Sequence, residues 1–119
     1  MCSIWIGKAK EITLTALADE QVRIEHKIKK LNDEMVSYPG YENPDDAAAI
    51  RMLNGEIGSW QQILTKLKKK TDEMMAKFRE IEALDDELDE AARVGDNDDE
   101  RMIYGEINGR MKELGFTRR

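Results

Sequence analysis

The chain has 119 residues and a net charge of −6, with 37% charged, 40% hydrophobic and only 6% aromatic residues. This length suits one domain, and the negative charge argues against a general affinity for nucleic acid. The richness in Ala, Glu, Lys, Leu, Ile and Met favours long helices or coiled coils. A single cysteine excludes an internal disulfide. Because no stretch reaches the length of a membrane span, we expect a soluble cytoplasmic protein.

Residues 1–17 are predicted to form an N-terminal extension. They include three consecutive bulky apolar residues, Ile4, Trp5 and Ile6, on an otherwise polar chain. These side chains are expected to pack over the end of the helices. As an alternative they form an exposed anchor, since tryptophan is enriched in interface hot spots. Trp5 is therefore a candidate protein-binding residue.

Apolar residues at spacings of three, four or seven predict a first helix over residues 9–37. The Tyr-Pro-Gly-Tyr segment at residues 38–41 ends it, because proline lacks a backbone donor and disfavours helix in the residue before it. The next helix is predicted from residue 45. Asn43 is a suitable N-cap, and Pro44 is suited to the first helical position.

An apolar stripe then runs from Leu53 to Leu88 in steps of three and four, interrupted only by Thr71 and Asp85. Two arrangements are compatible with it. One continuous helix over 45–94 would be about 75 Å long and would leave apolar stripes exposed, so that the chain must self-associate. Two helices, 45–70 and 71–94, would form a compact four-helix bundle with Thr71 as N-cap. The lack of glycine or proline at the junction favours one helix.

The last predicted helix begins within an acidic run. Residues 85–100 hold nine carboxylates and one basic side chain. Gly95 is a candidate left-handed C-cap, and Asp96 is a candidate N-cap for a helix over 97–114 that Gly115 closes. The whole chain is therefore predicted to be all-α.

The sequence also contains an internal duplication. Residues 51–57 read RMLNGEI and residues 101–107 read RMIYGEI, and weaker matches continue upstream. We therefore predict two tandem helical hairpins with coiled-coil-like packing, repeat 1 over 18–70 and repeat 2 over 71–119, within one domain.

The duplicated segment supplies most of the candidate protein-binding residues. Glycine inside a helix costs about 1 kcal/mol relative to alanine, so its recurrence needs a reason. Tight packing within each hairpin is the favoured one, and a glycine-lined docking surface is the alternative. The charged neighbours could anchor a partner or remain solvated. The candidates are Arg51, Gly55, Glu56, Arg101, Gly105 and Glu106.

The acidic run adds Asp96, Asp98, Asp99 and Glu100 to the candidates. A calcium loop is excluded, because position six holds arginine and position twelve holds isoleucine. The density of carboxylates could imitate nucleic acid, although the same residues also serve as helix caps and solubilising groups.

Other chemistries have weaker patterns. The only histidine, His26, lies on the charged side of its helix, and the acidic pairs Glu82/Asp85 and Glu87/Glu90 lie on one helix rather than on facing helices. The basic residues 66–70 and 118–119 could contact phosphate, but cations also complement the C-terminal end of a helix dipole. No catalytic residue, metal site or cofactor is therefore expected.

These observations favour a non-enzymatic helical interaction protein. It would self-associate and act as a small adaptor, assembly factor or inhibitor of a larger protein. The alternative is an acidic inhibitor that imitates nucleic acid and occupies a nucleic-acid-binding protein. A direct nucleic-acid binder and an all-α metal-dependent nucleotide hydrolase are less favoured.

Overall fold

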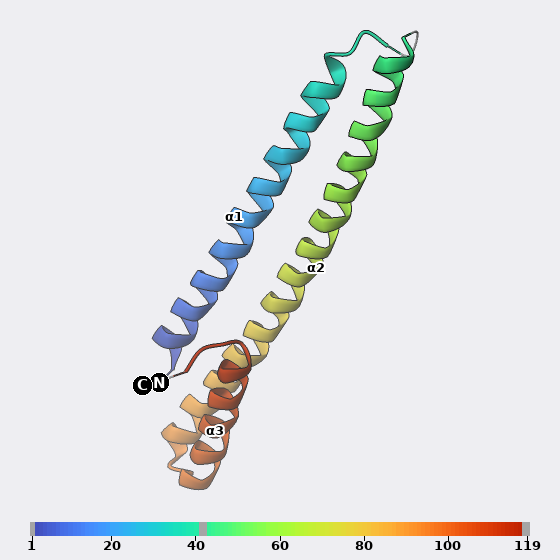
Figure 1. Ribbon diagram of the computed structural model, residues 1–119. Coiled ribbons are helices and arrows are strands. Elements are labelled where there is room, and N and C mark those ends of the chain that lie inside the picture. The colour runs from blue at the N-terminus through green and yellow to red at the C-terminus, as the bar shows by residue number, and fades with distance from the viewer. Residues whose placement is uncertain (1, 41–42, 118–119) are drawn as a thin grey trace. The chain divides into compact units, whose positions relative to one another are not determined.

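The computed structural model describes residues 2–40 and 43–117. Over these residues the protein is all-α, with three helices and no strand: α1 (Ser3–Val36), α2 (Pro44–Val94) and α3 (Asn97–Glu113) (Figure 1). The predicted all-α class is confirmed. Tyr41 and the C-terminal arginines 118–119 lie outside the described residues.

The junction at residues 70 and 71 lies inside α2, which continues for 51 residues. Thr71 does not cap a new helix. Its Oγ1 donates a hydrogen bond to the carbonyl oxygen of Leu67 at 3.0 Å, which satisfies the hydroxyl within an uninterrupted helix. Ser59 and Thr65 bond in the same way to the carbonyl oxygens four residues before them. The arrangement with two helices in this region is wrong, and the continuous helix is confirmed.

The predicted helix caps are confirmed where local sequence specifies them. The side chain of Asn43 accepts a hydrogen bond from the backbone N–H of Asp45 at 2.9 Å, just ahead of α2. Gly95 ends α2 with a φ of +78°, a conformation that glycine adopts without steric cost. Asp96 then caps α3 by accepting a hydrogen bond from the N–H of Asp99 at 3.1 Å.

The chain divides into two compact units, and α1 and α2 contribute to both. The three-helix unit consists of the described parts of residues 1–15 and 72–119. The hairpin unit consists of residues 16–71. Residues 2–15, predicted as part of an extension, thus belong to the same unit as α3.

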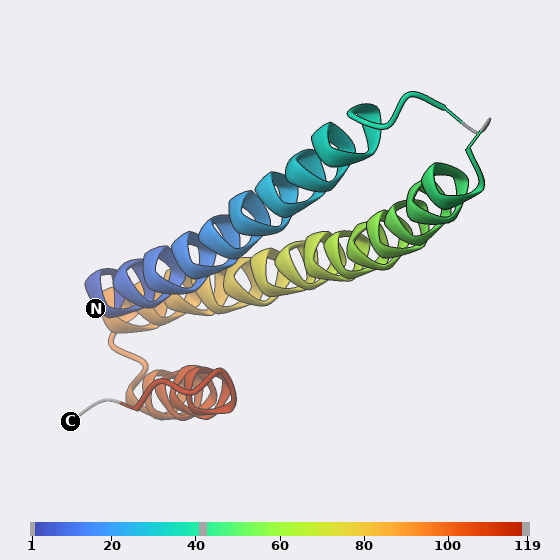
Figure 2. The same cartoon turned by 45° about the horizontal axis from the view of Figure 1, so that its top comes forward.

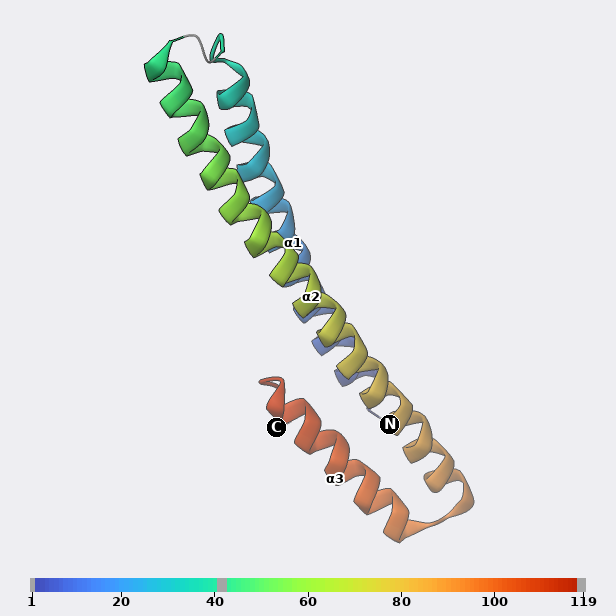
Figure 3. The ribbon, with the colours of Figure 1, turned by 90° about the vertical axis from the view of Figure 1, so that its right-hand side faces the viewer.

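The three-helix unit has a fully enclosed core. It combines the start of α1, the end of α2 and α3, which runs back alongside the last turns of α2 (Figure 3). The most deeply buried side chains are no more than 2% exposed. They are Cys2, Ile6, Ala9, Phe78, Ile81, Leu88, Ile107 and Met111.

The start of α1 at Ser3 differs from the prediction, which placed it at residue 9. The cause is Asp85 on α2, which is buried at 5% exposure. Its Oδ1 accepts a hydrogen bond from the backbone N–H of Cys2 at 3.1 Å, and its Oδ2 accepts one from Ser3 Oγ at 2.8 Å. A helix start has unsatisfied N–H groups and favours negative charge. The polar interruption of the apolar stripe therefore stabilises the first turn of α1.

The hairpin unit consists of the second half of α1 and the first half of α2, which lie side by side and antiparallel (Figure 2). Its central cluster contains Leu31, Leu53 and Ile57, which retain 6 to 9% exposure. Farther along α2, Leu64 and Leu67 are only half-buried. Two helices alone cannot enclose an apolar stripe from all sides, so its edges remain accessible to solvent.

Candidate protein-interaction site

The two matched segments, 51–57 in α2 and 101–107 in α3, direct equivalent positions toward the core of their respective units. Ile57 and Ile107 are buried, as is Leu53, and Ile103 is half-buried against the core. The remaining identical residues are exposed in both segments. We call these two sets the Arg-Met-Gly-Glu faces: Arg51, Met52, Gly55 and Glu56 in α2, and Arg101, Met102, Gly105 and Glu106 in α3.

The methionines are the most informative members of these faces. Met52 is 77% exposed and Met102 is 66% exposed. Both lie one position before a core residue and outside the apolar stripe. The sequence analysis therefore did not select them as candidate binding residues. An identical apolar residue at two matched positions off the stripe was the signal that could have identified them. Methionine is flexible and polarisable, and it is common at surfaces that bind other proteins.

The glycines turn away from the cores. A Cβ atom placed on Gly55 or Gly105 would meet no neighbouring atom within 4 Å, and the same is true of Gly58 and Gly109. The prediction of tight packing inside each hairpin is therefore wrong. Each helix contacts its neighbour through the isoleucine and leucine positions, which leaves the glycine side of the helix in open space.

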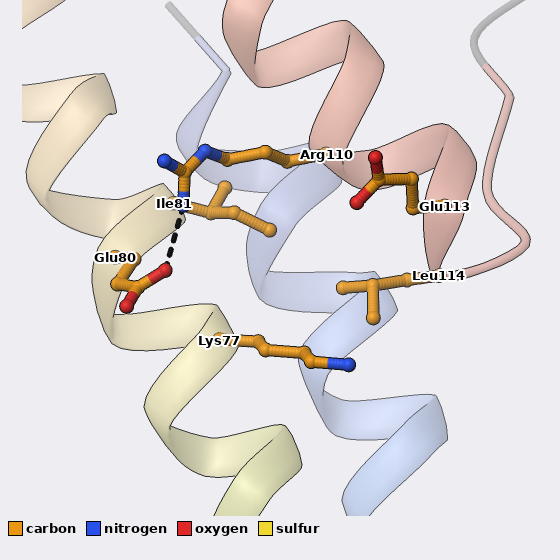
Figure 4. A pocket seen from close by; sticks show the side chains of 6 residues that line it. All are labelled: Lys77, Glu80, Ile81, Arg110, Glu113 and Leu114. Carbon is orange, nitrogen blue, oxygen red and sulfur yellow. Dashed lines mark hydrogen bonds and ion pairs between the residues drawn. The ribbon is translucent and has the colours of Figure 1, made fainter.

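The charged members of the two faces differ in their surroundings. In α2, Arg51 Nε donates to the carbonyl oxygen of Ala47 at 3.3 Å, within its own helix. In α3, Glu106 accepts a hydrogen bond from Arg110 at 3.1 Å, and Arg110 also bonds to Glu80 of α2 at 2.6 Å (Figure 4). These bonds, first the one to Glu106, raise the pKa of the Arg110 guanidinium. Glu106 therefore belongs to an ion-pair network that links α3 to α2.

The same network borders a small groove of about 300 Å³ in the three-helix unit. Figure 4 shows the Arg110 side chain extending from α3 toward Glu80, with the apolar side chains of Ile81 and Leu114 nearby. Arg110 is already bound to two carboxylates, so its guanidinium is less available to a ligand in this groove.

The candidate acids gather around the start of α3. Asp98 and Asp99 lie in its first turn, where negative charge stabilises a helix. The neighbouring carboxylate of Asp96 raises the pKa of Asp99. Glu100 and Arg101 line a groove of about 400 Å³ together with Leu88, Asn97 and Tyr104. Arg101 of the α3 Arg-Met-Gly-Glu face and its sequence neighbour Glu100 thus line the same groove.

Trp5 is half-buried and packs against the core of the three-helix unit. It contributes to the fold at the start of α1 rather than standing free as an anchor. Its neighbour Ile4 is the exposed apolar residue of this segment, with 77% of its surface accessible.

The hairpin unit contains a further surface that the sequence patterns had not identified. A groove of about 560 Å³ has Arg23, Ile24, Lys27 and Lys30 of α1 among its lining residues, together with Trp60 of α2. Glu20 and His26 complete the lining. The steps between the three cations, four and three residues, place them on one face of α1. We call this surface the basic groove.

The acidic pairs Glu82/Asp85 and Glu87/Glu90 are partly engaged in ion pairs with other residues. Glu82 forms an ion pair with Lys10 at 2.7 Å, and Glu90 pairs with Arg93. Among residues 2–40 and 43–117, no three His, Cys, Asp or Glu side chains gather closely enough to hold a metal ion. None of the described helices is both long and apolar enough to cross a membrane. Comparisons with protein-family models, curated proteins and solved structures gave no match to this chain.

Proposed function

We propose that this chain is a non-enzymatic helical interaction protein. It acts as an adaptor, assembly factor or inhibitor that binds a larger protein, and it self-associates. Its two Arg-Met-Gly-Glu faces derive from an internal duplication of a helical hairpin with coiled-coil-like packing. Each face binds an equivalent site on the partner.

The observation that carries this proposal is the exposure of Met52 and Met102 at matched positions. The fold accounts for the isoleucines of the two segments, because these residues fill the cores. It does not account for an exposed methionine beside a helical glycine that lowers helix stability by about 1 kcal/mol without a packing contact. Binding accounts for both, because a partner would bury the methionine and approach the helix closely at the glycine.

The chemistry of each face suits a modest protein interface. The methionine supplies apolar area that a partner can cover, and the arginine and glutamate lie beside it as polar rim contacts. An exposed arginine can also bond a partner carboxylate through two parallel hydrogen bonds. A partner with two equivalent sites would engage both faces, and the second contact would then be intramolecular and strongly favoured.

The test is affinity capture from the source cell with a tagged chain, followed by quantitative mass spectrometry. We expect the double variant Met52→Lys/Met102→Lys to lose a protein that the unmodified chain retains, by at least tenfold. Circular dichroism should show an unchanged helix content, because both side chains are exposed.

The matched control is Val36→Lys/Val94→Lys. These valines are 77% and 64% exposed, one in each unit, and lie outside the Arg-Met-Gly-Glu faces. The control should retain the partner. Equal retention by the methionine variant and the control would refute the assignment of the faces as the binding surface.

A further inference from the structure

We propose that the basic groove of the hairpin unit binds the acidic start of α3 from a second copy of the chain. This inference rests on the proposed self-association, and it names the surfaces that mediate it. The acidic start of α3 comprises Asp96, Asp98, Asp99 and Glu100.

The groove provides exposed positive charge beside an apolar floor. Lys27 and Lys30 are exposed, and neither forms an ion pair with any residue that the structure describes. Arg23 pairs with Glu20 at one end. Ile24 is buried at 3% exposure and Trp60 is half-buried, so the floor is apolar. A ligand with carboxylates at its edge and a short apolar body would meet both properties.

The extent of the positive charge favours a short acidic segment over a long polyanion. From Arg23 to Lys30 the cations span seven residue steps, or about 10 Å of helix. Over residues 20–34, however, α1 carries as many acidic as basic side chains, four of each, so no continuous positive surface follows this part of the helix. A nucleic acid would need cations that continue along its backbone.

The start of α3 fits this size and charge. From Asp96 to Glu100 the four acids cover about 6 Å along the helix, and none of them forms an ion pair with a described residue. The carboxylates of Asp96 and Asp99 instead repel each other, as the raised pKa of Asp99 indicates. Contact with two unpaired lysines would relieve this repulsion.

The charge complementarity between the groove and the acidic start of α3 indicates that a second copy of the chain binds in the groove. Every copy carries one basic groove and one acidic start of α3, so each of two copies holds the complement of both surfaces of the other, and we infer a reciprocal pair. Such closed pairing is the commonest arrangement of homo-oligomers. Because both surfaces are exposed and charged, the association should weaken as salt screens them.

The test exchanges the charges between the two surfaces. The groove variant is Lys27→Glu/Lys30→Glu, and the acid variant is Asp98→Lys/Asp99→Lys. Molecular mass is measured by light scattering and sedimentation at low and high salt. We expect the unmodified chain to associate, and each variant alone to associate at least tenfold more weakly. An equimolar mixture of the two variants should regain association, because each reversed surface then meets its complement.

Matched controls change the same charge elsewhere. Lys68→Glu/Lys69→Glu alters two exposed lysines of the hairpin unit outside the groove, and Asp72→Lys/Glu73→Lys alters two exposed acids of the three-helix unit. Both controls should associate as the unmodified chain does. Circular dichroism verifies that α3 remains folded. If the acid variant does not fold, Asp98→Asn/Asp99→Asn replaces it, and tenfold weaker association of that variant is then required.

Three outcomes would overturn the inference, and they differ in what they mean for the proposed function. Association that neither variant weakens would show that other surfaces mediate it, and self-association would stand. Loss in both variants without recovery in the mixture would show that the groove and the acids do not bind each other. A monomer under all conditions would exclude a second copy as occupant, while the capture experiment on the methionine faces would still decide whether another protein binds.

Discussion

The two units of this protein bury the same apolar stripe of α2 to different degrees. In the three-helix unit the stripe residues Phe78, Ile81 and Leu88 are no more than 1% exposed. In the hairpin unit the equivalent residues Leu53 and Ile57 retain 9% and 6% exposure. The stripe itself is equally regular in both, so the difference arises from α3, which covers the end of α2 in addition to α1.

This difference in burial means that one unit is the more stable part of the fold and the other has the more accessible apolar surface. The three-helix unit has an enclosed core, a carboxylate that caps the start of α1 and an ion-pair network between α2 and α3. The hairpin unit has a thin core, half-buried edges and the basic groove. Regions with fewer buried apolar contacts open locally at lower free energy. The hairpin unit is thus the part best suited to further association, because covering it offers the larger gain in apolar burial.

The largest effect expected concerns two isoleucines at matched positions. Ile107→Ala in the three-helix unit should lower the free energy of unfolding by about 3–5 kcal/mol, and Ile57→Ala in the hairpin unit by about 2–3 kcal/mol. Ile107 is 0% exposed and enclosed, so its cavity cannot collapse, whereas Ile57 is 6% exposed in a two-helix contact that can relax. Hydrogen exchange of each unit, with denaturant unfolding of the whole chain, measures the two values. Equal losses would contradict the distinction between the cores.

The next effect concerns the buried carboxylate that stabilises the start of α1. Asp85→Ala should cost about 1–3 kcal/mol, because the N–H of Cys2 and the hydroxyl of Ser3 lose their acceptor. Asp86→Ala is the control, since Asp86 is the exposed neighbour and its change should stay within about 0.5 kcal/mol. Thermal unfolding gives the difference, and faster hydrogen exchange in the first turn of α1 locates it. Similar melting temperatures for the two variants would show that the cap contributes little.

Signals that act over a few residues were sufficient to predict much of the fold. Asn43, Gly95 and Asp96 mark helix ends through bonds to neighbours in the chain, and these ends occur as predicted. The continuity of α2 followed from an apolar stripe that runs through the junction at residues 70 and 71, where the sequence has no glycine or proline. The start of α1 could not be predicted in this way, because the acceptor for its first N–H, Asp85, lies 83 positions along the chain.

The candidate site was predictable in part. The matched segments identified the arginine, glycine and glutamate positions of the Arg-Met-Gly-Glu faces. They identified neither the methionines nor whether the glycines faced a neighbour or open space. That orientation depends on where the other helices pack. The three cations of the basic groove had a visible spacing of four and three residues, yet Trp60 reaches the groove from another helix. The spacing of residues in the sequence indicates which side chains share a face of one helix. The groove is formed by two helices, so spacing alone does not reveal it.

The smallest effect tests the orientation of the glycines directly. Gly55→Ala and Gly105→Ala should each raise the free energy of unfolding by about 0.5–1 kcal/mol, because the added methyl group meets open space and alanine favours helix. Gly95→Ala is the internal control. Its φ of +78° strains any side chain, so the same substitution should cost about 1–2 kcal/mol there. Denaturant unfolding of the three variants shows whether the free energy of unfolding rises or falls in each. A loss of stability at Gly55 or Gly105 would mean that these positions pack closely after all. A gain accompanied by weaker partner capture would show that the glycines are kept for close approach of the partner at a cost in stability.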